Sequence, residues 1–564
     1  MTGRRASHQE RHQVCCRARR EPRIRSTAHW QVSRSVLLSP MSAPHDPKIW
    51  GPPDPPLQLI ARNLTTRYLA ILVDGALGLV LLPFNVSHLG TSAYGLWALT
   101  TSVTWYFGVL DLGYGSALVK FTAQYRALRD RIALNEIVST LALVFAGIGA
   151  LCFAVTALLA WRVDWLFNID PGQTRTAQLL LLTVGAYLSI RFPLSVFGAV
   201  VLGFQRYYLN NIASMAVSLM IAAVNVAVLS SGHGLVALVA STTAVRLLSL
   251  AVFVWNAYRA FPGLNVRPAL FRRARLHEVT GFSVYMFVLD IAAKLNYSSD
   301  NMVIGAMLNT TAVAVYTVGL RLSQVAQNLT NQLSAALFPN VVDSDAAQRH
   351  DRLRTIMVQG TKLSLALAAP LCLGLITMAG PLIHSWVGPR FSAGVLPARI
   401  LLLVVLVRIS TSSANLILKG AGQHKLLTYT NVATAAVNVL LSILLVRPLG
   451  LTGVALGTLI PVSVSTVAVI YPAACRRVGL PLTYPFAHGI WPALWPAAVM
   501  VALLVLARPL LAHGLLPVAL HLAVGGLVYT ILFVSIAMNA DERRLYWTRA
   551  RALLARQRQT PAAA

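Results

Sequence analysis

The 564-residue sequence has little charge. Only 12% of its residues are Asp, Glu, Lys or Arg, 56% are hydrophobic, and its mean hydropathy is +0.64. Soluble globular proteins carry about 25% charged residues. A chain with half that share cannot cover the surface of a water-soluble body, which excludes a soluble enzyme, a disordered protein and a coiled coil. Acidic residues are scarcest, 18 against 47 Lys and Arg. The resulting net charge of +29 does not indicate nucleic acid as a partner, because such binding requires a soluble basic domain for which this composition leaves no room.

Cysteine is also scarce. Cys15 and Cys16 lie in the N-terminal segment, Cys152, Cys372 and Cys475 lie in or at the ends of apolar runs, and no CxxC pair occurs. Disulfide frameworks and zinc sites require paired or clustered cysteines. Neither is indicated, and no cofactor is expected.

Long apolar runs, in contrast, are abundant. A membrane-spanning helix needs about 20 mostly apolar residues, and fourteen runs of about that length are separated by short links. They lie at 68–87, 94–119, 137–160, 178–202, 212–230, 235–257, 281–305, 312–338, 361–385, 396–418, 427–446, 452–474, 490–507 and 517–539. We therefore expect an all-α polytopic membrane protein with about fourteen transmembrane helices.

Lys and Arg are unevenly distributed over the links. If the N-terminus is cytoplasmic, the cytoplasmic links hold seventeen Lys and Arg residues and the outer links hold five. Cytoplasmic loops of membrane proteins carry such an excess. The distribution predicts that both termini are cytoplasmic, and it assigns most of the net charge to membrane topology.

The spans and tails divide the chain into six segments. They are a basic, Pro-rich and disordered cytoplasmic tail (1–66), an N-lobe (67–260), a cytoplasmic linker (261–280), a C-lobe (281–477), two further helices (488–540) and a basic cytoplasmic tail (541–564). Residues 1–40 lack any pattern, so a second hypothesis places the start of translation at Met41. A native peptide from upstream of Met41 would refute it.

The first six spans resemble the next six. Ala222–Val226 matches Ala435–Val439, and Arg191 matches Arg408 at a spacing of 217 residues. Internal repeats are common in transporters. Each repeat has an even number of spans, so both halves have the same orientation. The sequence predicts two pseudo-symmetric six-helix lobes followed by two C-terminal helices.

Several ionisable residues lie inside the apolar runs. Each costs ~2.5–3.5 kcal/mol at the centre of a membrane on insertion scales, so they are expected to face one another or water. They are Asp74, Asp111, Arg191, Arg246, Asp290, Lys294, Arg321 and Arg408. Helical spacing supports this expectation, because Arg321, Gln324 and Asn328 fall on one face of their helix.

The acidic members of this set allow structural or functional interpretations. Asp290 precedes Lys294 by four residues, a spacing that favours an ion pair. Asp111 lies in a Leu-Asp-Leu-Gly turn, where a capping role competes with ion coupling. Asp74, Asp111 and Asp290 are our candidates for ion coupling. Five cations exceed the acids near them and predict a cavity that binds an anion, with guanidinium groups suited to phosphate. These cations are Arg191, Arg246, Lys294, Arg321 and Arg408.

The segment 89–140 carries a family resemblance. Its motifs are Leu89-Gly90, Tyr94-Gly95-Leu96-Trp97, Leu110-Asp111-Leu112-Gly113, Ala117-Leu118-Val119, Leu134-Asn135 and Val138-Ser139-Thr140. They resemble bacterial polysaccharide-biosynthesis membrane proteins, the oligosaccharide-lipid flippases of the multidrug/oligosaccharidyl-lipid/polysaccharide exporter superfamily. The resemblance implies a MATE-like fold of two six-helix lobes around a cationic cavity, which binds the diphosphate of a polyprenyl-linked sugar and opens alternately to each side. The last two helices would help to form a groove for the lipid tail.

We therefore expect a flippase for a polyprenyl-diphosphate-linked oligosaccharide, such as an O-antigen, capsule or exopolysaccharide repeat unit, in the bacterial inner membrane. Its expected partners are that glycan lipid, membrane lipids and polysaccharide-assembly proteins. Arg191 and Arg408 would hold a pyrophosphate between the lobes, so replacing either with Ala should abolish export. The nearest rival hypothesis is a multidrug or cation antiporter of the same superfamily, for which an anionic cavity is expected. A polytopic glycan polymerase or ligase is less favoured, because no outer link exceeds about 20 residues.

Overall fold

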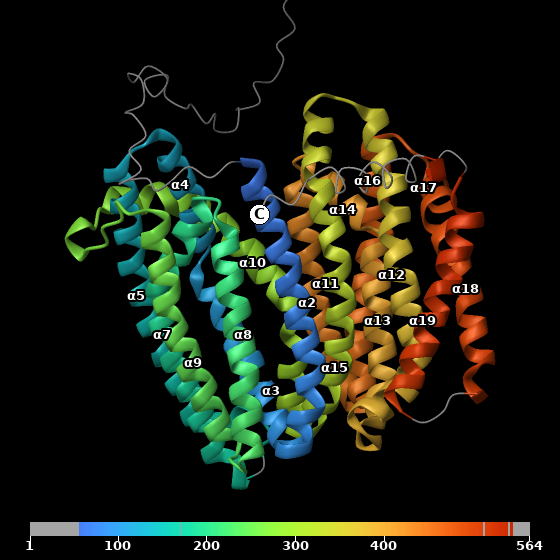
Figure 1. The fold of residues 1–564 in the computed structure, drawn as a ribbon, viewed down its shortest axis with the longest axis horizontal. Coiled ribbons are helices and arrows are strands. Elements are labelled where there is room, and N and C mark those ends of the chain that lie inside the picture. Colours follow the sequence, from blue (N-terminus) through green and yellow to red (C-terminus); the bar gives the residue numbers. More distant parts are fainter. Residues whose placement is uncertain (1–55, 170, 511–513, 540–541, 545–564) are drawn as a thin grey trace, which may run out of the picture. The chain divides into compact units, whose positions relative to one another are not determined.

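The computed structural model describes residues 56–169, 171–510, 514–539 and 542–544, and nearly all of these are helical. Within lipid, every backbone amide and carbonyl must be paired inside the protein, and a helix achieves this within a single segment. Long apolar runs with few prolines therefore become long helices, which lie side by side in Figure 1. No strand occurs in the described ranges.

The helices that cover the first six expected spans form the set that we call the N-lobe. They are α2 (Pro56–Leu89), α3 (Thr91–Tyr106), α4 (Tyr114–Leu128), α5 (Arg131–Trp161), α7 (Thr174–Gly203), α8 (Tyr207–Ser230) and α9 (Leu235–Ala260). The short turn η2 (Phe107–Asp111) joins α3 to α4, and α6 (Val163–Leu166) and η3 (Pro171–Gln173) join α5 to α7.

The next six expected spans fall in the set that we call the C-lobe. Its helices are α10 (Arg273–Met307), α11 (Thr310–Ala346), α12 (His350–Val387), α13 (Val395–Ser410), α14 (Ser412–Gly420), α15 (His424–Val464) and α16 (Tyr471–Val478). The turn η4 (Pro268–Leu270) precedes α10, η5 (Pro389–Gly394) joins α12 to α13, and the π-helical η6 (Ser465–Ile470) joins α15 to α16. The run labelled α15 covers two expected spans, because it holds two helices that meet at Gly450, where the backbone is not helical (φ +56°).

The last two expected spans form a C-terminal hairpin. It consists of α17 (Thr483–Pro485), η7 (Phe486–Ile490), α18 (Trp491–Leu506), η8 (Arg508–Leu510), α19 (Leu515–Leu532) and η9 (Phe533–Ala537). Both α18 and α19 pack against α12. Figure 1 shows this hairpin, in red, beside the C-lobe.

The fold class agrees with the prediction, but the number of spans is not settled by it. Each expected span coincides with helix, and ten helical stretches of the described chain are long and apolar enough to cross a membrane. One of the ten, 425–478, covers two expected spans. Helices α10 and α11 are not among the ten, and many of their side chains lie outside the described residues. The count of fourteen therefore remains a prediction.

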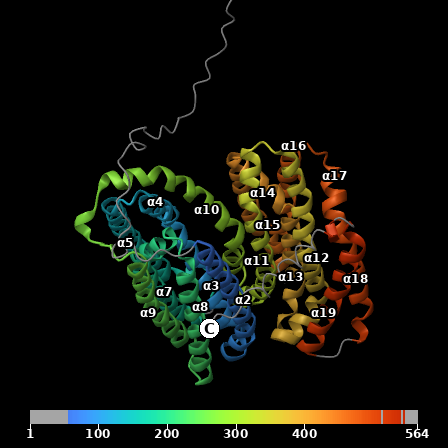
Figure 2. The ribbon, with the colours of Figure 1, turned by 45° about the horizontal axis from the view of Figure 1, so that its top comes forward.

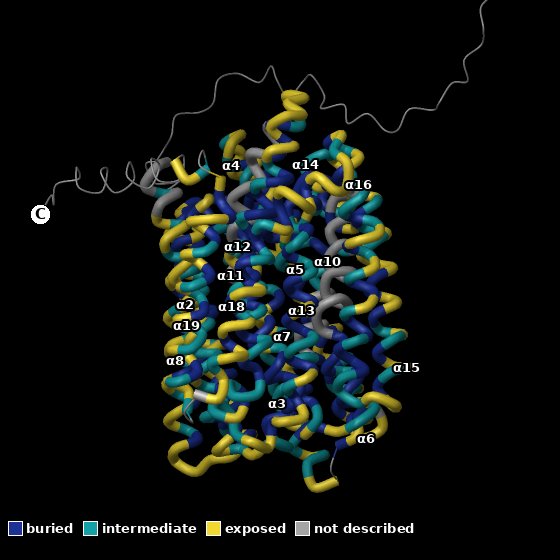
Figure 3. Tube along the Cα trace, turned by 90° about the vertical axis from the view of Figure 1, so that its right-hand side faces the viewer, coloured by how far each residue is buried: buried dark blue, intermediate teal, exposed yellow. Residues whose placement is uncertain are grey.

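The two lobes repeat one packing pattern. In the N-lobe α5 packs on α7 and α2 packs on α8, and in the C-lobe α12 packs on α13 and α10 packs on α15. Counted by expected span, the third packs on the fourth in each half. The first span packs on the fifth in the N-lobe and on α15, which holds the fifth and sixth spans, in the C-lobe. Figure 3 shows exposed positions along outer helices such as α8 and α15, and buried positions between the helices.

The lobes meet along α3 and α11. The contact is so close that a Cβ on Gly95 would lie 1.7 Å from the Thr310 carbonyl oxygen. The Ser92 and Thr310 hydroxyls lie 3.1 Å apart, and beside this contact Asn301 Nδ2 of α10 donates to Ser102 Oγ of α3 at 2.9 Å. We call this contact the α3–α11 seal. The distribution of Lys and Arg predicts that it lies toward the outer side of the membrane.

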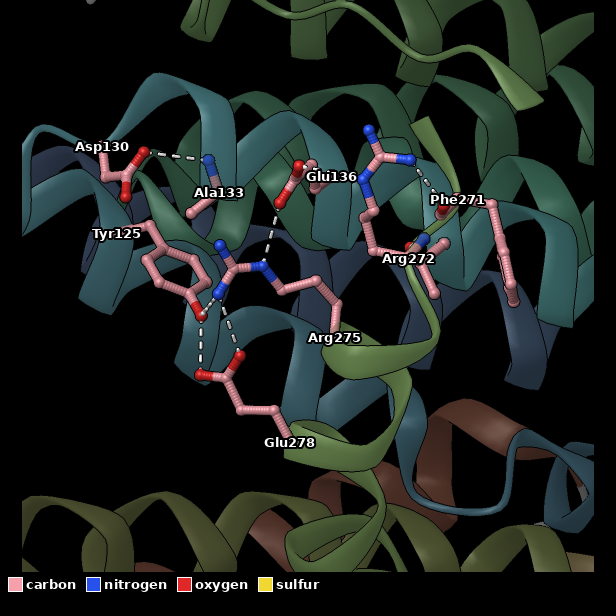
Figure 4. Close-up of polar contacts among 9 residues, drawn as sticks. Tyr125, Asp130, Ala133, Glu136, Phe271, Arg272, Arg275 and Glu278 are labelled. Atoms are coloured by element: carbon pink, nitrogen blue, oxygen red, sulfur yellow. Dashed lines mark hydrogen bonds and ion pairs between the residues drawn. The ribbon is translucent and has the colours of Figure 1, made fainter. Parts of the chain in front are cut away.

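Helix α10 begins against α4 and α5 of the N-lobe and packs along α15 of the C-lobe (Figure 2). At its start, Glu136 of α5 pairs with Arg272 at 3.4 Å and with Arg275 at 3.1 Å. Arg275 Nη1 also donates to the Tyr125 hydroxyl at 3.0 Å and to Glu278 at 3.2 Å (Figure 4). Burial and the hydrogen bond to Glu278 raise the pKa of Tyr125, so its hydroxyl stays protonated and donates to Glu278 at 2.6 Å. We call this cluster the α10 anchor.

Candidate functional site

Helix α11 presents one polar strip on a body that is otherwise buried. Its residues 313–319 are buried on every side, and the next turns expose Arg321, Gln324 and Asn328 on a single face. Arg321 Nη1 donates to Gln324 Oε1 at 3.3 Å, and the Arg321 guanidinium also interacts electrostatically with the Tyr94 hydroxyl of α3 in the opposite lobe. A face exposed to lipid would be apolar. We infer that this strip faces an aqueous space between the lobes.

Arg246 occupies a similar position in the N-lobe. The outward face of α9 exposes apolar side chains such as Leu248 and Val252. Arg246 is exposed too, but it shares the opposite face with the buried residues Val239 and Leu250. Its guanidinium therefore reaches water on the inner side of α9, where the helix packs against α7 and α8.

Arg191 and Arg408 differ in their surroundings. Arg191 is exposed in the middle of α7, one turn before the exposed Ser195. Arg408 is half-buried near the end of α13 and interacts electrostatically with the Asp300 carboxylate. The cationic excess is therefore smaller on the C-lobe than composition alone predicts. The clamp of Arg191 and Arg408 on a pyrophosphate remains a prediction.

Asp300 is the centre of a buried polar cluster that sequence reasoning missed. Its Oδ2 accepts a hydrogen bond from the Tyr316 hydroxyl at 2.6 Å and another from Thr458 Oγ1 at 3.2 Å. Asn438 Nδ2 donates to Thr458 Oγ1 at 2.9 Å, and Ser299 Oγ donates to Asn438 Oδ1 at 3.3 Å. The cluster joins α10, α11 and both halves of α15. Its signal in the sequence is the polar triplet Ser299-Asp300-Asn301 at the end of an apolar run.

The three acidic candidates have different outcomes. Asp74 is exposed on the same face of α2 as the exposed Arg67, whereas Leu72 and Val80 are exposed on another face. Asp111 Oδ1 accepts from the Gly115 amide at 2.8 Å, a capping contact in the first turn of α4. The side chains of Asp290 and Lys294 lie outside the described residues.

The described residues contain no group of three His, Cys, Asp or Glu side chains placed to hold a metal ion. What they bring together is amide, hydroxyl and guanidinium groups on the inner faces of helices from both lobes. Such groups hydrogen-bond to phosphate and sugar oxygens. The arrangement is suited to binding a polar anionic ligand inside an apolar bundle.

The chain matches the model of a known protein family. A model of the family described as polysaccharide biosynthesis protein matches residues 89–396, more than half of the chain. The chain belongs to this family. Its multi-pass helical architecture and its motif segment agree with that assignment.

Relatives cover most of the chain at low identity. The probable flippase AglR of Haloferax volcanii is 21% identical over 86% of this chain and 97% of its own length. An uncharacterized membrane protein of Bacillus subtilis, EpsK, is 23% identical over 76% of this chain and 85% of its own. The solved structure of the lipid II flippase MurJ in an inward closed conformation matches with a TM-score of 0.65 at 14% identity. That match covers 85% of this chain and 98% of MurJ, and it confirms the predicted fold.

Proposed function

We propose that this polysaccharide biosynthesis family protein moves a polyprenyl-diphosphate-linked oligosaccharide across the bacterial inner membrane by alternating access. The substrate is the repeat unit of an O-antigen, capsule or exopolysaccharide. The protein transports this lipid without changing it covalently, and both of its termini are cytoplasmic. Polysaccharide-assembly proteins are further partners in this proposal.

One observation carries the proposal: the polar strip of Arg321, Gln324 and Asn328 on α11, whose Arg321 interacts with Tyr94 of the opposite lobe. A diphosphate carries several acceptor oxygens, and a guanidinium binds such oxygens through two parallel hydrogen bonds. Arg321 supplies the charge, and the amides supply donors for sugar hydroxyls. The names of AglR as a probable flippase and of MurJ as a lipid II flippase support the same class of substrate.

The other cations extend this site. Arg191 and Arg246 on the N-lobe and Arg408 and Lys294 on the C-lobe are proposed to follow the diphosphate as the lobes rock. Asp74, on the exposed polar face of α2, stays a proposed ion-coupling residue, and Asp290 is proposed with it. Asp111 is a weaker candidate, because its carboxylate caps α4.

Two other functions are less well supported. A multidrug or cation antiporter would be expected to expose acids inside the lobes, whereas the exposed inner positions of α9 and α11 are Arg246 and Arg321. A glycan polymerase or ligase would be expected to hold its catalytic groups on a large outer loop, and the described outer links are short.

Arg321→Gln provides the test. The change removes the charge while keeping hydrogen-bonding capacity. We expect transport of a polyprenyl-diphosphate-linked oligosaccharide into proteoliposomes to fall about 10- to 100-fold, because a hydrogen bond to a charged group contributes about 1.5–3 kcal/mol. The protein level should stay unchanged. The exposed Arg352→Gln at the start of α12 is the matched control and should transport normally. Wild-type transport by Arg321→Gln would refute the proposed site.

A further inference from the structure

The turn between α7 and α8 is held in a fixed shape at the end of the N-lobe that the Lys and Arg distribution assigns to the cytoplasm. Gln205 has a φ of +62°, in the left-handed region. Asn63 of α2 holds the turn on both sides, because its Nδ2 donates to the Gln205 carbonyl at 2.7 Å and its Oδ1 accepts from the Tyr208 amide at 2.8 Å. The neighbouring residue Arg206 is therefore placed by the backbone.

Arg206 and Arg126 bring two positive charges together beside this turn. Arg206 is only 7% exposed, and its Nη1 donates to the Arg259 carbonyl oxygen at 3.5 Å. Arg126 of α4 lies over the Phe204 ring at 5.6 Å. Burial and the nearby Arg206 charge both lower the pKa of Arg126. An anion that bridges the half-buried Arg126 and the buried Arg206 would lower the repulsion between the two guanidinium groups.

Aromatic residues place this pair at the depth of lipid headgroups. Phe204 stacks on Phe261 with ring centroids 5.3 Å apart, which forms an apolar floor. On the outer face of α9, Trp255 is 59% exposed and Tyr258 is 41% exposed. The Arg259 guanidinium lies over the Trp255 ring at 5.4 Å. Exposed Trp and Tyr residues concentrate where the membrane meets water.

We propose that Arg126 and Arg206, flanked by Arg259, bind the phosphate group of an anionic phospholipid in the cytoplasmic leaflet. The paired guanidinium groups match the geometry of phosphate oxygens. The exposed face of α9 offers an apolar surface for the acyl chains. The exposed Trp255 lies on the face of α9 opposite Arg246, and the proposed lipid site does not depend on the transport proposal.

The test measures lipid binding to the purified full-length protein. Native mass spectrometry would count phosphatidylglycerol molecules bound to the wild type and to an Arg126→Gln, Arg206→Gln variant. A basic residue near an anionic lipid surface contributes about a fivefold gain in affinity, so the double change should weaken phosphatidylglycerol binding about 30-fold. The control is Arg352→Gln, Lys425→Gln, which removes two exposed charges from the C-lobe at its cytoplasmic end and should keep the same bound lipid.

Thermal unfolding separates the sources of phosphate. Phosphatidylglycerol should raise the melting temperature of the wild type, and inorganic phosphate at the same concentration should not. Equal stabilisation by inorganic phosphate would overturn the lipid assignment, as would a preference of this site for undecaprenyl phosphate, which would make it a substrate contact. Equal loss of lipid from the control variant would show general attraction to basic surfaces and would also overturn it. If the double variant is not monodisperse, the single changes Arg126→Gln and Arg206→Gln carry the test, each with about fivefold weaker binding expected.

Discussion

A buried ion pair fastens the C-terminal hairpin to α12. Lys362 Nζ lies 2.6 Å from Glu542 Oε2, and the two side chains are only 5% and 13% exposed. Gln359 Nε2 donates to the other carboxylate oxygen at 2.5 Å, and the Asn539 amide donates to Oε2 at 3.0 Å. The contacts from Lys362 and Gln359 therefore join the first third of α12 to the residues that follow the hairpin. The pair holds the hairpin against the C-lobe.

Replacing one partner should leave the other charge buried alone. We expect Glu542→Gln to lower the free energy of unfolding by about 3–5 kcal/mol, the usual cost of breaking a buried pair from one side. The loss is measured by thermal unfolding of the purified protein in detergent. Asp351→Asn is the control, because its pair with Arg354 is exposed and should contribute little. Equal effects of the two changes would contradict a special role for the buried pair.

The contacts of Glu542 also predict that the free energy of unfolding depends on pH. Burial alone would raise the pKa of Glu542, but the hydrogen bonds from Lys362, Gln359 and the Asn539 amide outweigh it and lower the pKa below its ordinary value of 4.5. A lowered carboxyl pKa stabilises the fold above pH 4.5 and loses that contribution as the pH falls through the native value. The difference between wild type and Glu542→Gln should therefore be full at neutral pH and shrink in acid.

Sequence patterns located the charged residues inside the apolar runs but not their partners. Arg408 was interpreted as an unneutralised cation, yet Asp300 of α10 lies close enough to interact with it. Lys362 stands near the start of an apolar run and gave no signal, because its partner Glu542 is 180 residues away. Periodicity reports which face of a helix is polar. Only the packing of distant helices determines whether that face meets water or an opposite charge.

The apolar runs predicted the helices well, and the limits of that prediction have local causes. Gly113, with a φ of +76°, separates η2 from α4 inside one expected span, and Gly450, with a φ of +56°, separates the two helices of α15. Such breaks depend on backbone conformations that hydropathy does not report.

Gly95 allows the close approach of α3 and α11. A Cβ there would lie 1.7 Å from the Thr310 carbonyl oxygen, far inside any normal contact. Gly95→Ala should therefore disfavour the sealed state. Overpacking costs about 1–3 kcal/mol, which shifts the equilibrium roughly 5- to 150-fold toward the parted state. Gly147→Ala on α5 is the control, because a Cβ there meets nothing within 4 Å.

The shift is measured from the outer side of the membrane. A cysteine at Ser102, in a variant whose native cysteines are replaced, should react faster with an impermeant maleimide when Gly95 is Ala. Ser102 of α3 is partly buried beside the seal and accepts a hydrogen bond from Asn301 Nδ2 of α10. Unchanged labelling in Gly95→Ala, with normal folding, would show that the α3–α11 contact does not restrict access.

By their contacts, the link after α9 and the start of α10 belong with the N-lobe, although the apolar runs place α10 in the C-lobe. Residues 261–272 link α9 to α10 and are hydrogen-bonded to α5. The Asn265 amide donates to Asn135 Oδ1 at 3.0 Å, and the Arg272 amide donates to Thr140 Oγ1 at 3.0 Å. The α10 anchor continues this attachment through Glu136. Farther along α10, Asp300 accepts hydrogen bonds from Tyr316 and Thr458 of the C-lobe. Rocking of the lobes should therefore open the α3–α11 seal and leave the anchor intact.

Two cross-links distinguish the moving contact from the fixed one. Ser92→Cys with Thr310→Cys should form a disulfide, because the two hydroxyl oxygens lie 3.1 Å apart. Oxidation should stop glycan-lipid transport in proteoliposomes, and reduction should restore it. Glu136→Cys with Arg275→Cys, joined by a short bifunctional maleimide, should keep most of the transport of the same variant before linking, because α5 and the start of α10 move together. Continued transport with the first pair oxidised would mean that the lobes do not part at α3 and α11, and loss of transport with the second pair linked would place the moving contact at the start of α10.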